Sequence, residues 1–98
     1  MTININTALS IQDMTRDFIR DKVGKLETYY DRIERADVFI KKGAGSGVED
    51  VSVEIRLAVP GPDLFAEETS DSLEKAVPSV VDKLARQIRK HKDKISKR

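Results

Sequence analysis

Residues 51–59 read VSVEIRLAV and give the clearest strand signal in the chain. Apolar valine, isoleucine and leucine occupy every second position, and serine, glutamate, arginine and alanine fill the positions between them. An alternation with a period of two places one row of side chains on each face of a strand. The segment therefore predicts a strand with one buried face and one face that is mostly in contact with solvent.

Further strands are predicted on either side of this segment. The PGPD sequence at residues 60–63 favours a tight turn, and residues 64–69 are expected to return antiparallel to the first strand. Upstream, residues 36–41 alternate in the same way. Residues 42–47 contain three glycines, but their spacing does not match a phosphate-binding loop and a strand follows them, so we predict a plain hairpin loop.

The N-terminal third predicts a short strand and a helix. Residues 2–7 alternate isoleucine with asparagine and indicate a strand. A helix is expected from about Ile11 or Thr15 to Arg32, with Ser10 or Asp13 as a possible cap. One face of this helix is apolar and consists of Ile19, Val23, Leu26, Tyr30 and Ile33.

The last helix is predicted to begin at residues 69–71 and to run to the end of the chain. Its apolar residues recur at steps of three, four and seven, as one face of an α-helix requires: Val77, Val80, Val81, Leu84, Ile88 and Ile95. Pro78 lies inside this pattern, where proline costs about 3 kcal/mol. The helix either begins near Ala76 or is one kinked element, and Leu73 favours the second interpretation.

The predicted order is β-α-β-β-β-α, an α+β fold in a single domain that spans residues 1–98. One mixed or antiparallel sheet must bury its apolar face, and the two amphipathic helices can cover it. A chain of 98 residues supports one such core and is too short for two.

The net charge of +1 conceals an uneven distribution. Residues 83–98 contain eight Lys or Arg and one Asp, a net charge of +7, whereas residues 1–82 carry ten Lys or Arg and sixteen acidic residues, a net of −6. Charge that is concentrated in this way steers a polyanion to one side of a protein.

A row of cations lies beside the apolar stripe of the last helix. Its members also recur at steps of three and four: Lys83, Arg86, Lys90, Lys94 and Lys97. Like charges at this spacing repel each other, and a nucleic-acid backbone would relieve the repulsion. A solvated helix end, where cations suit the helix dipole, is the other interpretation. If both helices cover one face of the sheet, Lys22 and Lys25 could join this row in one basic surface.

Catalytic and metal chemistry find little support in the composition. The chain has one histidine, His91, and no cysteine, so clustered His/Cys metal sites are excluded and a nucleophile–histidine pair is unsupported. We predict no enzymatic activity, no catalytic residue, no metal and no cofactor. No apolar run reaches the roughly 18 residues that a membrane span needs, and residues 1–6 do not resemble a secretory signal. The absence of cysteine fits a cytoplasmic location.

Three segments together resemble one protein family, the short ribosome hibernation-promoting factors, which also contain the ribosome-associated inhibitor and are called the sigma-54 modulation protein family. The three segments are KLE at residues 25–27 with YDRI at 30–33, VPGPDLFA at 59–66, and DKLARQIRKHK at 82–92. The resemblance covers essentially the whole chain. It implies a four-stranded sheet with two parallel helices packed on one face, similar to double-stranded RNA-binding domains.

The resemblance also implies a function and a set of contact residues. Members bind ribosomal RNA of the small subunit, in the channel for mRNA and for A- and P-site tRNA, and keep idle ribosomes inactive, often as dimers. The positions that match the family's rRNA contacts are Lys22, Lys25, Lys83, Arg86, Lys90 and Lys94, with Arg89 a weaker match. Pro78 departs from the family pattern.

The sequence ends at Arg98, and this short length suggests which branch of the family to expect. The chain has neither an acidic tail nor a C-terminal dimerisation domain, which suggests the short branch and a monomer off the ribosome. A generic double-stranded RNA-binding domain and a module that docks an acidic protein are the alternative functions.

Overall fold

The computed structural model describes residues 1–43 and 50–96, with side chains as far as residue 93. Its elements, in chain order, are β1 (Thr2–Thr7), α1 (Asp13–Gly24), the short 3-10 helix η1 (Lys25–Thr28), β2 (Arg35–Lys42), β3 (Val51–Ala58), β4 (Leu64–Ser70) and α2 (Leu73–Ser96). This order confirms the predicted β-α-β-β-β-α arrangement, and all four strands lie within one residue of their predicted limits.

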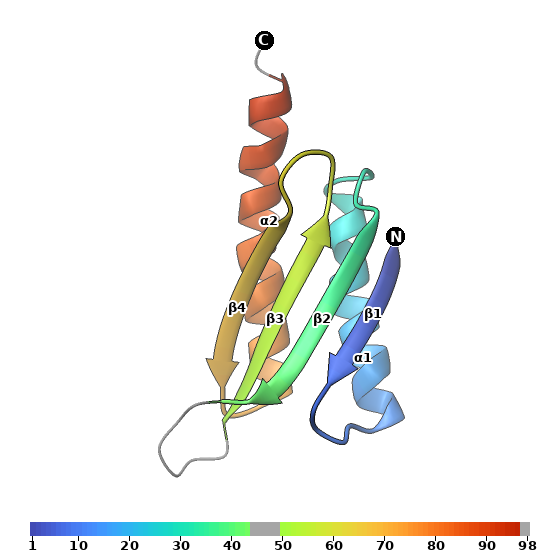
Figure 1. The fold of residues 1–98 in the computed structure, drawn as a ribbon, viewed down its shortest axis with the longest axis vertical. Coiled ribbons are helices and arrows are strands. Elements are labelled where there is room, and N and C mark those ends of the chain that lie inside the picture. Colours follow the sequence, from blue (N-terminus) through green and yellow to red (C-terminus); the bar gives the residue numbers. More distant parts are fainter. Residues whose placement is uncertain (44–49, 97–98) are drawn as a thin grey trace.

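The four strands form one mixed sheet in the order β1-β2-β3-β4 (Figure 1). The β1 strand is parallel to β2, and the other two pairs are antiparallel. In this register Val38 lies opposite Ile55, which in turn lies opposite Ala66. Because all three side chains are buried, this row marks the apolar face that the alternation in the sequence predicts.

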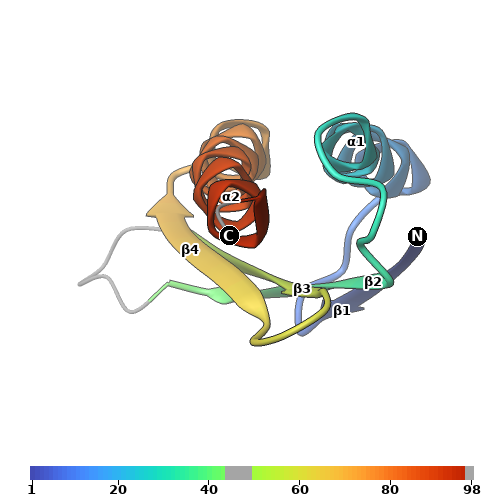
Figure 2. The same ribbon diagram turned by 90° about the horizontal axis from the view of Figure 1, so that it is seen from above.

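Both helices cover this apolar face, and the other face of the sheet is open (Figure 2). The α1 helix lies over β1 and β2, α2 lies over β3 and β4, and the two helices run in the same direction (Figures 1 and 2). One core fills the space between the layers, with Leu26, Leu57 and Leu84 fully buried in it. The open face exposes the rings of Phe39 and Phe65.

The first helix is shorter than its apolar pattern predicts. Ile19, Val23 and Leu26 are fully buried, as expected, but the α-helix ends at Gly24 and continues only as η1 to Thr28. The prediction of one helix as far as Arg32 is therefore wrong. Glycine weakens a helix interior, and the Thr28 hydroxyl donates to the Lys25 carbonyl at 2.6 Å, which closes a tighter turn.

The start of this helix also differs from the prediction. Gln12 occupies the N-cap position and its side chain makes no capping hydrogen bond, so neither Ser10 nor Asp13 is the cap. Asp13 lies in the first turn instead, where a carboxylate interacts favourably with the positive end of the helix dipole.

The last helix is one element that includes Pro78. It begins at Leu73, two to four residues after the predicted start at residues 69–71. The Ser72 hydroxyl accepts a hydrogen bond from the Lys75 amide at 3.3 Å and serves as the N-cap. The missing N–H of Pro78 would have bonded to the carbonyl of Glu74. Since Glu74 is exposed, water can satisfy this carbonyl, and the helix tolerates the proline.

The turn between β3 and β4 depends on a glycine in the left-handed region. Gly61 has a φ of 91°, a conformation that costs other residues about 1–2 kcal/mol. The predicted turn at residues 60–63 is thereby confirmed. The predicted hairpin loop at residues 42–47 falls mostly outside the described residues.

Two glycine substitutions should have opposite effects on stability. Gly61→Ala is expected to lower the free energy of unfolding by about 1–2 kcal/mol, because its φ is positive. Gly24→Ala is expected to raise it by about 0.4–1 kcal/mol, since Gly24 has a helical φ of −59° and open space around it. Urea denaturation of both variants measures the two changes, and a shift in the same direction for both would contradict this account.

Candidate nucleic-acid interface

One flank of α2 is held by hydrogen bonds and an ion pair against β4, at the edge of the sheet. The Lys83 ammonium donates to the backbone carbonyl of Glu67 at 3.0 Å and forms an ion pair with Glu68 at 2.9 Å. One turn further along, the Gln87 amide donates to the carbonyl of Phe65 at 2.8 Å. Both acceptors lie on β4, so the predicted row of cations begins on the side of α2 that faces away from α1.

This ion pair changes the acidity of Glu68. The hydrogen bond from Lys83 is the main reason that the pKa of the Glu68 carboxyl lies below its usual value, and a hydrogen bond from the Ser79 hydroxyl at 2.9 Å acts in the same direction. Two donors thus hold the carboxylate in its charged form. Lys83 therefore has a structural role in addition to any role in binding a ligand.

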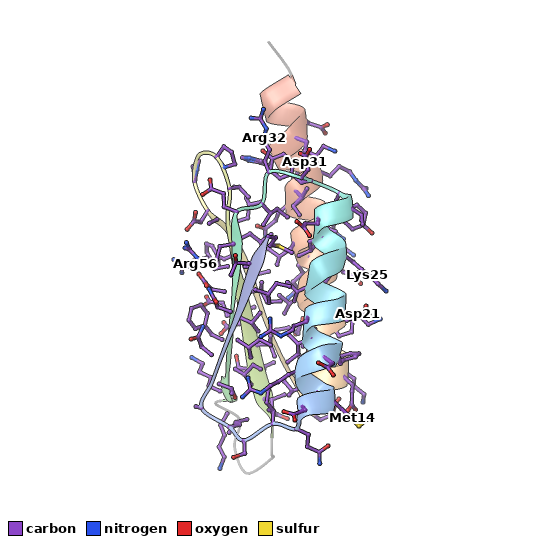
Figure 3. All side chains as sticks on the ribbon, turned by 90° about the vertical axis from the view of Figure 1, so that its right-hand side faces the viewer. Met14, Asp21, Lys25, Asp31, Arg32 and Arg56 are labelled. Atoms are coloured by element: carbon purple, nitrogen blue, oxygen red, sulfur yellow. The ribbon has the colours of Figure 1, made fainter. Side chains whose placement is uncertain are left out.

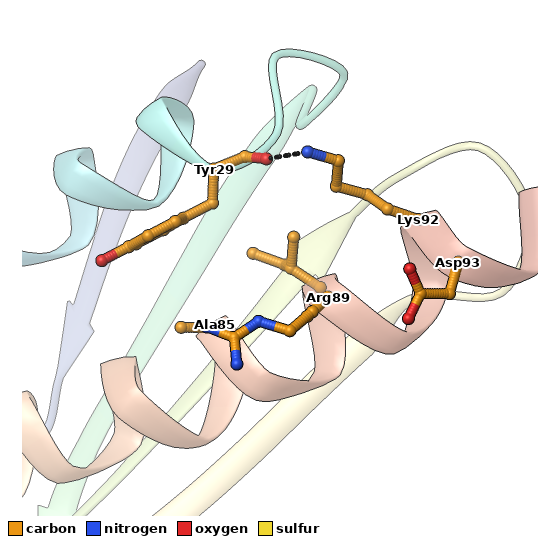
Figure 4. A pocket seen from close by; sticks show the side chains of 6 residues that line it. Tyr29, Ala85, Arg89, Lys92 and Asp93 are labelled. Carbon is orange, nitrogen blue, oxygen red and sulfur yellow. Dashed lines mark hydrogen bonds between the residues drawn. The ribbon is translucent and has the colours of Figure 1, made fainter. Parts of the chain in front are cut away.

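The opposite flank of α2 faces the end of η1. The Lys92 ammonium donates to the carbonyl of Tyr29 at 2.9 Å. A small hollow between the two elements is lined by Tyr29, Ala85, Arg89, Lys92 and Asp93, among others (Figure 4). The Tyr29 ring is half exposed, and the hollow thus combines an accessible aromatic ring, two cations and one carboxylate.

Two exposed cations lie between these flanks. Successive residues of an α-helix are 100° apart, which places Arg86 on the outer side of α2, between Lys83 and Arg89. Lys90 is also exposed, and it lines a shallow hollow with Leu64, Gln87 and His91 at the start of β4. Residues 83–92 of α2 therefore present cations on both flanks of the helix and on the outer side between them.

The α1 helix and η1 each contribute one cation to the same layer. The Lys22 ammonium lies over the Phe18 ring, 5.7 Å from its centroid. Phe18 lines a hollow with Glu74 of α2, so this edge of α1 faces the second helix. Lys25 is exposed and points away from the sheet, whereas Arg56 lies on the opposite, open face (Figure 3).

The structure changes the expected partners of Lys22 and Lys25. These two residues share the helical layer with the cations of α2 whose side chains the structure describes, but the flank of α2 that meets α1 and η1 carries Arg89 and Lys92. Lys83 faces β4 on the other flank. Seven cations with described side chains come from the last turn of α1, from η1 and from residues 83–92 of α2: Lys22, Lys25, Lys83, Arg86, Arg89, Lys90 and Lys92. We refer to these seven as the basic surface.

Sequence reasoning missed Lys92. It lies three residues after Arg89 and seven after Ala85, a helical spacing that could have revealed a second row. The side chain of Lys94 lies beyond those that the structure describes. The carboxylates of Asp82 and Asp93 are also exposed on α2 and interrupt the positive charge.

The two tyrosines and the histidine near this surface differ in burial. Tyr30 is only 8% exposed and belongs to the core, whereas Tyr29 is 50% exposed. His91 is partly buried and meets the Tyr30 ring edge-on, with 5.6 Å between the ring centroids. Within residues 1–43 and 50–96, no cluster of three His, Cys, Asp or Glu could hold a metal ion, and no helix is long and apolar enough to cross a membrane.

The sequence is similar to a known family over nearly its full length. Residues 3–96 match the family described as Sigma 54 modulation protein / S30EA ribosomal protein. The Ribosome hibernation promoting factor of Escherichia coli K12 is 34% identical over 96 residues, which cover 97% of each chain. The Ribosome hibernation promotion factor of Staphylococcus aureus is 32% identical over 90 residues, which cover 92% of this chain and 47% of that protein.

The fold is similar to two solved structures. The N-terminal domain of Thermus thermophilus Protein Y matches 93% of this chain and 99% of its own length, with a TM-score of 0.79 and 27% identity. A ribosomal subunit interface protein from Coxiella burnetii matches 95% of this chain with a TM-score of 0.84, but at 21% identity it supports the fold alone. The chain therefore belongs to the Sigma 54 modulation protein / S30EA ribosomal protein family, which confirms the family predicted from its sequence.

Proposed function

We propose that this protein is a ribosome hibernation factor. In this proposal it binds ribosomal RNA of the small subunit, in the channel used by mRNA and by A- and P-site tRNA, and keeps idle ribosomes inactive. The observation that carries the proposal is the basic surface on the helical layer of a chain in this family. Its site of action is then the cytoplasm, and its partner is the small ribosomal subunit.

The proposed mechanism combines charge with shape. Lysine and arginine side chains neutralise backbone phosphates and release the counterions that surround RNA, which supplies affinity without reading the base sequence. A rigid domain held in this way occupies space that tRNA and mRNA require. The sheet and helices form a single packed unit, so occupation of the channel needs no folding step.

The cations of the basic surface differ in how they are held before RNA binds. Arg86, Arg89 and Lys90 are exposed and can meet phosphates without breaking a contact inside the protein that the structure records. Lys83 and Lys92 already donate to backbone carbonyls, so each would exchange or share a partner. We therefore assign the first three, with Lys25, to the centre of the RNA contact, and Lys22 and Lys83 to its periphery. Lys94 stays a contact predicted from the sequence.

Binding to the ribosome should weaken steeply with salt. If about four to six phosphate contacts form, the affinity should fall roughly 10²- to 10³-fold between 50 and 200 mM salt. Sedimentation of the purified protein with small subunits through sucrose gradients, over a series of salt concentrations, measures this dependence. Affinity that is constant across the series would overturn an interface based on phosphate contacts.

A competition experiment separates this proposal from a generic double-stranded RNA-binding domain, which reads only the A-form shape. Purified small subunits are saturated with the protein, and a duplex RNA of unrelated sequence is then added in excess. A specific site in the subunit should retain the protein. If duplex RNA displaces all of the protein already at about one duplex per protein molecule, the protein would instead be a general duplex binder.

A further inference from the structure

The strand pairing determines which residues at the two free edges of the sheet direct their backbone N–H and C=O groups outward. The amides of Thr2 and Ala8 donate to carbonyls of β2 or of the residue that precedes it, so even-numbered residues of β1 face β2 and odd-numbered ones face outward. The Glu34 amide donates to the Ala58 carbonyl. Even-numbered residues of β3 thus face β2, and the odd-numbered ones face β4.

The same alternation fixes the outer edge of β4. Ile55 lies opposite Ala66, and Val53 lies opposite Glu68. Even-numbered residues of β4 therefore direct their peptide groups toward β3, and Phe65, Glu67 and Thr69 direct theirs outward. Unpaired peptide groups along an edge strand form a template on which another extended segment can add.

Side chains from the helices occupy outward carbonyls at both edges. The Arg20 guanidinium of α1 donates to the Ile3 carbonyl of β1 at 3.0 Å. On β4, the Gln87 amide donates to the Phe65 carbonyl and the Lys83 ammonium to the Glu67 carbonyl, at 2.8 and 3.0 Å. These three interactions join residues 16 to 22 positions apart in the chain, so no local pattern creates them.

The spacing on β4 shows why one flank of α2 fits this edge. Four residues of an α-helix rise about 6 Å, and two residues of an antiparallel strand span about 6.8 Å. Lys83 and Gln87, four residues apart on α2, therefore match the successive outward carbonyls at positions 67 and 65. The helix runs antiparallel to β4, which gives the observed pairing.

We propose that Gln87 and Lys83, together with Arg20 at the opposite edge, close the sheet against the addition of a strand from a second copy of this chain. The two donors on α2 take the acceptors that an incoming backbone would need. The second copy is the relevant occupant because two β4 edges present the same peptide pattern and can pair antiparallel about a two-fold axis. The exposed Phe65 ring would add apolar contact to such a pair.

The proposed association of two β4 edges should depend on salt in a characteristic way. Pairing of two β4 edges would bring Glu67 and Glu68 of both copies together, and like charges on neighbouring strands repel. Salt screens this repulsion. An opened edge should therefore associate more strongly as salt rises, which is the opposite of the dependence expected for RNA binding. The salt dependence therefore distinguishes a failure of this proposal from a failure of the proposed function.

Sedimentation velocity of the full chain over a concentration series tests the proposal. The wild-type protein should remain monomeric. Gln87→Leu should shift part of the protein to the dimer sedimentation coefficient, Gln87→Leu with Lys83→Met should shift more, and added salt should increase both shifts. The matched control is Lys75→Met, an equally apolar change on the same helix at a residue that pairs with Asp71 and not with the sheet.

A proline at position 67 distinguishes strand addition from nonspecific association. The N–H of Glu67 faces outward, so Glu67→Pro removes no backbone hydrogen bond to β3 yet blocks an incoming strand. On the open face it also removes the hydrogen bond that the Ser52 hydroxyl of β3 donates to the Glu67 carboxylate at 3.1 Å. Added to the double variant, it should restore the monomer. The proposal is overturned if the double variant stays monomeric at every concentration, if Lys75→Met associates equally, or if the proline leaves the association unchanged.

Discussion

Replacing Arg86 and Lys90 together by glutamate is expected to abolish detectable binding to the small ribosomal subunit. A hydrogen bond to a charged group contributes about 1.5–3 kcal/mol, so the loss of two phosphate contacts should lower the affinity about 10²- to 10⁴-fold. Repulsion between the new carboxylates and the phosphates adds to this loss. Co-sedimentation with purified subunits at low salt measures the change.

The fold should survive this double substitution. Both side chains are exposed, and surface substitutions of this kind usually change the free energy of unfolding by less than about 0.5 kcal/mol. They are four residues apart on one helix, so the repulsion between two cations in the wild-type protein is replaced by a similar repulsion between two carboxylates. Equal urea midpoints for the variant and the wild type would show that lost binding reflects the interface.

The open face of the sheet supplies the matched control. Arg56 lies there, on the other side of the molecule from Lys25 (Figure 3), and Lys41 is exposed on the same face. Lys41→Glu with Arg56→Glu makes an identical change in net charge, and we expect at most a small loss of affinity. An equal loss in both double variants would mean that overall charge, and not the helical layer, governs binding.

Lys83 is less suitable for this experiment than its place in the sequence suggests. Its ammonium holds α2 against β4 through Glu67 and Glu68. Reversal of its charge would remove a possible RNA contact and an internal contact at once, and would place three carboxylates together. Any loss of binding in a Lys83→Glu variant would therefore have two causes.

The strands and the core could be predicted because their pattern is local. Alternation over residues 51–59 fixes which side chains of β3 turn inward, and burial of Val53, Ile55 and Leu57 confirms it. The end of the first helix could not be predicted in this way. Leu26 and Tyr30 are buried whether the backbone is an α-helix or a 3-10 turn, because periodicity records which side chains face the core and not which peptide groups bond.

The arrangement of the candidate site depends on contacts between distant parts of the chain. The cationic row on α2 follows from helical spacing alone, but the flank of α2 that meets α1 depends on how the helix is rotated against the sheet. Hydrogen bonds from Lys83 and Gln87 to β4, across 16 and 22 positions, accompany that rotation. The spacing of lysines within residues 82–98 contains no information about them.

Leu84→Ala is expected to cause the largest loss of stability among the predictions made here. The Leu84 side chain is fully buried between α2 and the sheet, and truncation of such a residue typically costs about 2–5 kcal/mol. A domain of this size has only about 5–15 kcal/mol in total. Urea denaturation should show a much lower midpoint, whereas Met14→Ala, at a residue that is 80% exposed, should leave it almost unchanged.

This core variant should lose ribosome binding for a different reason than the charge variant. Leu84 packs α2 against the sheet. Its replacement by alanine therefore reduces the population of folded protein without removing any cation from the basic surface. An osmolyte such as trimethylamine N-oxide favours the compact state and should restore binding to Leu84→Ala. The same osmolyte should not rescue Arg86→Glu with Lys90→Glu, which is already folded. Rescue of both variants, or of neither, would contradict the separation of fold and interface, because binding would then depend on something other than a folded α2 that carries its cations.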